Sequence, residues 1–172
     1  PDELEALADA CEEWEAPAEP PAVTGFEHTD AGNAELFAYL FGDKVRYDHA
    51  AERWLIWDQH RWAPDISLEI YRLALTAARE RKRASADIDD RKAADAAWAW
   101  GKSSESTSKI KATLDQLRSV EPVSDNGMSW DVNPQLLGLA NGVVNLATGE
   151  FRAGKREDRI TMSCGVAYDV AA

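Results

Sequence analysis

The chain has 172 residues, of which 45% are hydrophobic and 29% are charged, a composition that is typical of a globular domain and excludes an intrinsically disordered chain. Its formal net charge of −12 excludes a protein that binds nucleic acid through overall basic charge. Eight acidic residues and no basic ones lie within the first 22 positions, so the remaining chain is only mildly acidic. Any DNA contact therefore has to come from a local basic patch.

The N-terminal segment differs in composition from the rest of the chain. Residues 1–16 favour a short acidic amphipathic helix, and the proline-rich residues 16–23 favour an extended connector. We therefore expect a linker at residues 1–24 and one compact domain at residues 25–172, a length that can bury a sizeable core. Since the sequence begins with proline rather than methionine, we expect it to be part of a longer protein.

The cysteines and the hydropathy pattern indicate the compartment. Cys11 and Cys164 lie far apart, without other Cys or His residues at metal-ligand spacing, which favours a reducing environment over a disulfide or zinc framework. No apolar run approaches the roughly 18 residues of a membrane-spanning helix, and the acidic start is unlike a signal peptide. We expect a cytoplasmic protein with no membrane contact.

The first part of the expected domain predicts a helix followed by a β-meander. Thr29 or Asp30 can cap a helix that ends at Gly42. Strand-like runs then alternate with turn-length segments, and Pro64 ends the last of them. The three predicted strands span residues 44–48, 53–57 and 61–64.

Three further helices are predicted from the periodicity of apolar residues. The first spans residues 67–85, and the second is an alanine-rich helix that ends at Gly101. The third is capped by Ser103 or Ser104. The apolar residues on one face of this third helix are Ile110, Leu114 and Leu117.

The last third of the chain returns to a β pattern. Residues 136–146 and 150–154 flank a turn and predict a hairpin, and residues 160–170 form a final extended run. The predicted fold class is therefore α+β: a helical domain with a short antiparallel tryptophan-rich β-meander and a C-terminal β-hairpin.

Aromatic and arginine residues alternate along the meander. Side chains of a strand point to alternate faces, so one face has to pack on the helices while the other can present rings and guanidinium groups to single-stranded DNA. Bases stack on aromatic rings, and arginines pair with phosphates. The alternative is that all the tryptophans of the meander belong to the core. The candidate DNA contacts in this region are Arg46, Arg53, Trp57 and Arg61.

A second group of candidate DNA contacts is basic and lies in the helical region. Residues 79–83 are rich in Arg and Lys and end the helix at 67–85, where the helix dipole favours cations. Lys102 differs, because we expect it near the start of a helix. The alternative is that these cations are merely exposed to solvent at helix ends and faces. If they do bind phosphates, that binding would be salt-dependent. The candidates in this group are Lys102, Lys109 and Lys111.

The sequence contains no complete catalytic motif. Residues 149–156 match the start of a phosphate-binding loop, but Arg156 stands where such a loop requires Ser or Thr to ligate Mg²⁺, so we expect an ordinary hairpin. The histidines are isolated, and acids at residues 87–90 lie in a polar linker where a metal site is only a minor alternative. We therefore expect no catalytic, cofactor-binding or metal-binding residue in this chain.

Several short motifs occur together in a fixed order along the chain. They are Thr29-Asp30-x-Gly32-Asn33, Gly42-Asp43-x-x-Arg46-Tyr47, Trp54-x-x-Trp57-Asp58-x-x-Arg61-Trp62, Trp100-x-x-Ser103, Asn141-Gly142-Val143-Val144-x-Leu146-x-Thr148-Gly149 and Val166-Ala167-Tyr168-Asp169. In this order they resemble the domain that precedes the motor in superfamily 3 primase–helicases of phages and plasmids, a domain shared with the poxvirus primase–helicase. The sequence departs from the typical pattern at Asn145, where Asp is usual, and at Gln59 or His60, where Gly is usual. Both departures concern turn geometry.

The resemblance implies a noncatalytic collar or linker domain that helps to assemble a helicase ring and guides DNA into it. It also implies a parent protein that is a hexameric, ATP-dependent DNA helicase or primase–helicase, with ATP and Mg²⁺ bound by a motor downstream. Given its acidity, the domain alone should bind single-stranded DNA weakly. The alternative is a protein-interaction module of a replication protein, which docks a partner through the acidic segment and exposed aromatic residues without contacting DNA. A primase-like nucleotidyl transferase ranks third, because no set of carboxylates is convincing.

Overall fold

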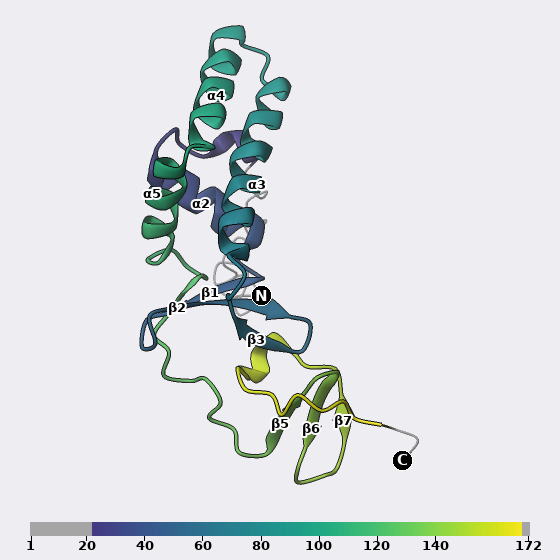
Figure 1. Ribbon diagram of the computed structural model, residues 1–172. Helices are drawn as coiled ribbons and strands as arrows, with labels where there is room; N and C mark the ends of the chain where they lie inside the picture. The colour runs from purple at the N-terminus through teal and green to yellow at the C-terminus, as the bar shows by residue number, and fades with distance from the viewer. Residues whose placement is uncertain (1–21, 170–172) are drawn as a thin grey trace, which may run out of the picture.

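The computed structural model describes residues 22–169 of the chain. Along the long axis of the molecule, a group of helices is followed by a four-stranded sheet and then by a three-stranded sheet (Figure 1). The α+β class with a tryptophan-rich meander is therefore confirmed. The helix predicted at residues 1–16 and nearly all of the predicted connector lie outside the described residues.

The first α-helix follows a short 3₁₀ turn, η1 (Val23–Gly25), and is capped as predicted. Helix α2 spans Asp30–Phe41, and the hydroxyl Oγ1 of Thr29 accepts a 2.9 Å hydrogen bond from the backbone N–H of Gly32. This bond satisfies one of the N–H groups that the first turn of a helix leaves without a partner. At the other end, the backbone N–H of Gly42 closes the helix on the carbonyl of Ala38.

We expect the Thr29→Ala substitution to lower the free energy of unfolding by about 1 kcal/mol, because it removes the side-chain acceptor at the start of α2. Urea unfolding monitored by circular dichroism measures this loss. Thr29→Ser retains the hydroxyl and should remain within about 0.5 kcal/mol of the wild type. Equal losses in the two variants would show that the methyl group of Thr29, rather than its cap, provides the stability.

The meander has the predicted strands to within a residue or so. Strands β1 (Val45–Asp48), β2 (Arg53–Asp58) and β3 (Arg61–Pro64) pair antiparallel in chain order. A fourth strand, β4 (Ser124–Asp125), pairs parallel to β1 and was not predicted. The sheet order is therefore β3-β2-β1-β4, and β1 has neighbours on both sides.

One face of this sheet packs on the helices. Tyr47 lies opposite Trp54 and Val45 lies opposite Ile56 in the β1–β2 register, and all four side chains belong to, or pack against, the hydrophobic core that the helices form. The other residues of β1 and β2 alternate to the opposite face, which includes Arg46 and Trp57. The core alternative therefore holds for Trp54.

Helices α3 (Glu69–Ala84), α4 (Arg91–Ser104) and α5 (Thr107–Leu117) follow, with a 3₁₀ turn, η2 (Ser85–Asp87), after α3. The predicted apolar face of α5 is buried. Two predictions of helix ends were wrong. Helix α4 continues past Gly101, because the absent side chain lets α4 approach α3: a Cβ at this position would lie 2.9 Å from the backbone nitrogen of Lys82. The cap of α5 is Ser106, whose Oγ accepts from the backbone N–H of Lys109, rather than Ser103 or Ser104.

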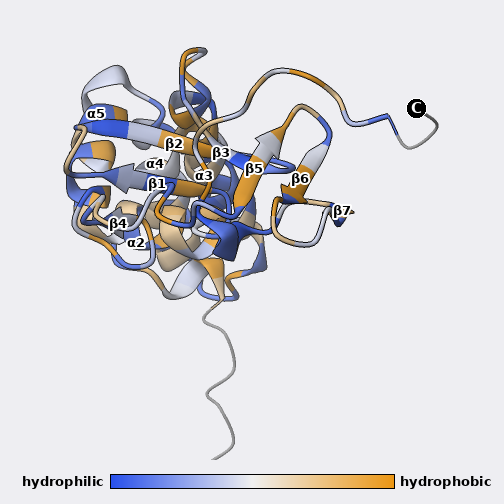
Figure 2. Ribbon diagram, turned by 90° about the horizontal axis from the view of Figure 1, so that it is seen from below, coloured by the Kyte–Doolittle hydropathy of each residue, from blue (hydrophilic) through white to orange (hydrophobic). Residues whose placement is uncertain are grey.

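The C-terminal part forms the predicted hairpin, and one further strand extends it into a separate three-stranded sheet. Strands β5 (Leu136–Leu139), β6 (Gly142–Asn145) and β7 (Phe151–Arg152) pair antiparallel in order. The predicted first arm at 136–146 was wrong as a single strand, because the chain reverses between β5 and β6. The extended run at 160–168 lies beside β5, with hydrogen bonds from Cys164 N to Gly138 O (3.1 Å) and from Ala140 N to Val166 O (3.0 Å). Figure 2 shows this sheet to one side of the meander, with hydrophobic segments in β5 and β6.

None of the helices formed by residues 22–169 is long and apolar enough to cross a membrane.

Candidate nucleic-acid interface

The second face of the meander is covered by the segment between β7 and the final extended run. The backbone N–H of Trp62 donates to the carbonyl of Ile160 (2.8 Å), and its indole Nε1 donates to the carbonyl of Arg156 (3.1 Å). Trp62 is consequently 1% exposed. The 3₁₀ turn η3 (Arg156–Asp158) is thereby fixed against strand β3.

Three tryptophans form a continuous row at this junction. The ring of Trp57 lies 5.4 Å from that of Trp62 in an edge-on arrangement, and the ring of Trp62 lies 5.9 Å from that of Trp130. Two of these residues come from the meander, and the third comes from the loop between β4 and β5. The row therefore joins the meander to the loop that leads to the second sheet.

Each ring of this row lies under one guanidinium group. The guanidinium carbon of Arg156 is 5.4 Å from the centroid of the first ring, that of Arg46 is 4.8 Å from the second, and that of Arg159 is 3.9 Å from the third. Such stacking attracts the cation to the ring face and fixes its orientation. We refer to these six residues as the arginine–tryptophan cluster: Arg46, Trp57, Trp62, Trp130, Arg156 and Arg159.

Two arginines of the cluster have carboxylate partners. Arg156 pairs with Asp43 at 3.1 Å, and Arg159 pairs with Asp125 at 2.6 Å. The carboxylate of Asp43 is 58% exposed, so its ion pair is weak and open to competition. The carboxylate of Asp125 is largely buried, which holds Arg159 more firmly in place.

Arg46 is the exception in the cluster. Within residues 22–169 no carboxylate lies at ion-pair distance from its guanidinium, and its Nη1 group donates instead to the carbonyls of Gly42 and Val45. Burial lowers the pKa of Arg46 below its ordinary value; Arg159 and Arg156 act in the same direction and Asp125 opposes them. Arginine nevertheless remains protonated in proteins. A half-buried cation without a paired anion is thus placed among other cations.

A cavity of about 340 Å³ opens at the cluster. Its size is within the range typical of small-ligand sites. Its walls contain three guanidinium groups and a single carboxylate, and the buried tryptophan forms part of the lining. The lining residues are Arg46, Trp62, Arg156, Glu157 and Arg159.

A comparison with protein-family models matched residues 34–172 to the model described as D5 N terminal like. This match covers most of the chain. The chain belongs to the D5 N-terminal-like family. The family is the N-terminal domain of D5-type primase–helicases, so the resemblance drawn from the ordered motifs is confirmed. A search of curated proteins gave no match.

Within the D5 N-terminal-like domain, the predicted contacts of the meander separate into two kinds. Arg46 and Trp57 lie together in the arginine–tryptophan cluster. Arg53 instead pairs with Asp48 at 3.1 Å, and Arg61 donates from Nη1 to the carbonyl of Thr161 at 3.2 Å. Arg53 therefore joins β2 to β1, and Arg61 joins the meander to the C-terminal segment. Contact of either side chain with DNA stays a prediction.

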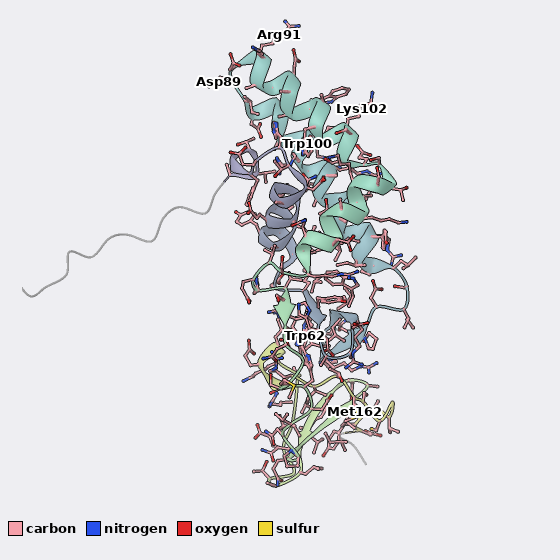
Figure 3. The ribbon with its side chains drawn as sticks, turned by 90° about the vertical axis from the view of Figure 1, so that its left-hand side faces the viewer. Trp62, Asp89, Arg91, Trp100, Lys102 and Met162 are labelled. Atoms are coloured by element: carbon pink, nitrogen blue, oxygen red, sulfur yellow. The ribbon has the colours of Figure 1, made fainter. Side chains whose placement is uncertain are left out.

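The three predicted lysines lie elsewhere in the D5 N-terminal-like domain. Figure 3 shows Lys102 among the helices, well separated from Trp62 along the long axis. Lys102 lies in the last turn of α4, so its expected position near a helix start was wrong, and its ammonium lies 5.0 Å from the ring centroid of Trp98. Lys109 is 4.4 Å from the ring of Trp100 and also forms an ion pair.

Lys109 and Lys111 differ in their availability to a ligand. The partner of Lys109 is Asp30, 3.1 Å away, which joins α5 to the start of α2. Lys111 is exposed on α5 and has no ion-pair partner among the residues that the structure describes. The two groups of predicted contacts thus do not form one surface. Of the three predicted lysines, Lys111 is the one for which the described residues show no ion pair, hydrogen bond or ring contact.

The sequence analysis missed three members of the cluster: Trp130, Arg156 and Arg159. Arg156 was considered only as the residue that spoils the phosphate-binding loop, and residues 149–156 do form a turn, the short strand β7 and the start of η3. Arg156 begins η3 and Arg159 is its C-cap in the left-handed region, so their spacing in the sequence did not indicate that both would reach the tryptophan row. Nothing in the local sequence indicated that Trp130 would lie beside them.

The acids at residues 87–90 lie at the tip between α3 and α4, as the labels of Asp89 and Arg91 show (Figure 3). Asp90 has an identified task there, since its carboxylate accepts a 2.7 Å hydrogen bond from the backbone N–H of Ala93 and caps α4. Capping by Asp is a common way to begin a helix.

Proposed function

We propose that this domain is a noncatalytic collar or linker domain of an ATP-dependent replicative helicase, which supports ring assembly and guides single-stranded DNA to the motor. The observation that supports the proposal best is the convergence of three arginines on one cavity of about 340 Å³, in a domain of the primase–helicase family. A chain with a net charge of −12 has few other surfaces suited to phosphates.

In this proposal the chemistry belongs to other parts of the parent protein. ATP and Mg²⁺ would be bound by a motor of a hexameric primase–helicase of a phage or plasmid, and this domain would contribute contacts along the path of the DNA. Electrostatic attraction of this kind depends on salt, because each neutralised phosphate releases bound counterions. Binding of DNA by the isolated domain should be weak, because the negative net charge of the chain repels phosphates.

We expect the double substitution Arg46→Gln/Arg156→Gln to lower the affinity of the chain for single-stranded DNA by about tenfold or more, because two charged hydrogen-bond donors are lost. The slope of log affinity against log salt should fall in magnitude by about 0.7 for each phosphate contact removed. Fluorescence anisotropy of a labelled oligothymidine, titrated at several salt concentrations, measures both quantities.

The matched control is Arg72→Gln/Arg91→Gln, which removes the same charge from exposed side chains on α3 and α4. This control should bind DNA as the wild type does, and circular dichroism should show both variants folded. If the wild-type chain showed no salt-dependent binding of single-stranded DNA, the proposal of DNA guidance would be contradicted. Ring assembly is tested separately, by analytical ultracentrifugation of the parent protein with and without this domain.

A protein-interaction module remains the second candidate function, and exposed aromatic side chains on the helices favour it. Trp98 on α4 is 47% exposed, and Tyr39 on α2 and Tyr71 on α3 are also exposed. Aromatic residues are enriched in protein–protein interfaces. Pull-down of replication proteins by the chain, with and without residues 1–22, distinguishes this function from DNA guidance, since a partner bound through the acidic segment is lost with it.

A further inference from the structure

We infer that the arginine–tryptophan cluster is a phosphate-binding site that leaves the bases of nucleic acid unread, because its tryptophans orient arginines instead of stacking on bases. This inference deepens the proposed function and rests on it for the identity of the ligand, the phosphate backbone of single-stranded DNA. It also replaces the expectation that meander tryptophans serve as stacking platforms.

The tryptophan faces are not available to bases. Trp62 is 1% exposed, and the indole N–H of its side chain is already bonded to the carbonyl of Arg156. Trp57 and Trp130 are partly exposed, but each has a guanidinium over its ring, at 5.4 Å and 3.9 Å from the respective centroid. A base that stacked on the face under the guanidinium would first have to displace that arginine. The rings therefore act as supports for the cations.

The guanidinium of Arg46 has N–H donors that are not used in hydrogen bonds to the described residues. Its hydrogen bonds to other described residues all come from Nη1, so Nε and Nη2 have no acceptor among those residues, and neither of these two atoms is buried. Because Arg46 lines the cavity, these two groups are open to a ligand there. Arginine presents Nε and Nη2 as a planar fork that matches two oxygens of a phosphate.

The surrounding atoms also lack acceptors. The Nε atom of Arg156 and the indole Nε1 of Trp130 are buried without any hydrogen-bond partner in the described part of the chain. Buried donors are nearly always paired in proteins, so the cluster has a deficit of acceptor atoms. A phosphate supplies acceptors only, and a small adjustment of side chains on its arrival would let it relieve this deficit.

The charges around the cavity favour the binding of one anion, and one of them also limits its affinity. Asp43 and Asp125 each neutralise one arginine, which leaves Arg46 as the unmatched cation. Glu157 is the one carboxylate among the residues that line the cavity, and it opposes an incoming anion. The Glu157→Gln substitution should therefore raise the affinity for phosphate by about two- to fivefold, as expected for a like charge near the surface.

The decisive test compares ligands with and without bases. The 172-residue chain is titrated with an oligothymidine and with an abasic oligomer of the same length, with anisotropy as the readout. We expect the two affinities to agree within about threefold, whereas stacking of even one base would favour oligothymidine by about fivefold or more. Arg46→Gln should lower both affinities by about tenfold, and Glu157→Gln should raise both.

A second readout reports on the site without DNA. Sodium pyrophosphate is added to ¹⁵N-labelled protein, and the indole N–H signal of Trp130, assigned by its loss in Trp130→Phe, is followed by NMR. This signal should shift in the wild type and in Glu157→Gln but not in Arg46→Gln. The spectrum of the remaining signals shows whether each variant is folded.

The outcomes separate the inference from the proposed function. Pyrophosphate binding that depends on Arg46, combined with no binding of either oligomer, would overturn the function in DNA guidance and leave the phosphate site standing. If neither Arg46→Gln nor Glu157→Gln changed the affinity for DNA, the phosphate site would be overturned and the DNA contact assigned to other residues, such as Lys111. A strong preference for oligothymidine over the abasic oligomer would overturn the claim that bases are unread.

Discussion

The Trp62→Ala substitution should lower the free energy of unfolding by about 3–5 kcal/mol, the usual loss for a large aromatic side chain removed from a core. Trp62 is 1% exposed and contacts both neighbours of the tryptophan row. It also donates its indole N–H to the carbonyl of Arg156. The substitution therefore creates a cavity and also removes the hydrogen-bond partner of that carbonyl. The contact between the meander and the C-terminal segment would be lost first.

Urea unfolding followed by far-ultraviolet circular dichroism measures this effect. The matched control is Trp98→Ala, which removes the same side chain from a site that is 47% exposed on α4 and should cost less than about 1 kcal/mol. If the two substitutions proved equally costly, the junction between the two sheets would contribute nothing special to stability, and the cluster would lose its rigid support.

Arg81→Ala should have the second-largest effect, a loss of about 3 kcal/mol. This side chain is 2% exposed, and it donates from Nη1 to the carbonyl of Phe26 (2.8 Å) and from Nη2 to the carbonyl of Gly32 (3.1 Å). Burial lowers the pKa of its guanidinium below the ordinary value. The substitution therefore leaves two carbonyls unpaired and opens a cavity between α3 and the chain that precedes α2.

Arg81→Met tests how much of this loss is due to packing. Methionine keeps most of the side-chain volume and removes the buried charge of the arginine, whose Nε atom has no acceptor in the described chain. We therefore expect Arg81→Met to recover at least about 1 kcal/mol of the free energy of unfolding relative to Arg81→Ala. The control is Arg79→Ala on the same helix, where the side chain is about half exposed. Equal stability of all three variants in urea unfolding would mean that Arg81 does not tie these elements together.

Local signals accounted for the elements that the sequence predicted well. Thr29 at the start of α2 and Gly42 at its end are chemical markers that act within one turn. The alternation along β1, β2 and β3 is likewise local. Gly101 misled the prediction, because glycine ends helices but also permits two helices to approach closely, and only the position of α3 distinguishes the two uses.

The candidate site was only partly predictable for a related reason. Arg46 and Trp57 were named as candidates because aromatic and arginine residues alternate along the meander, and the strand register places both on one face. Arg156 and Arg159 reach this face from almost 100 residues further along the chain, as the 94-residue separation between Trp62 and its hydrogen-bond partner Arg156 shows. No local pattern encodes such a juxtaposition, and the lysines of the helical region were grouped with the meander only by their charge.

The parallel pairing of β4 with β1 has a consequence for how the chain folds during synthesis. The meander closes through short turns, but the side of β1 away from β2 is completed only by residues such as Ser124, which contacts His49 from 75 positions further on. Pairings of such long range form slowly. Until about residue 125 has left the ribosome, β1 presents unsatisfied backbone groups of the kind that promote association between nascent chains. Fragments that end within α5 should therefore aggregate, whereas fragments that include β4 should remain dispersed.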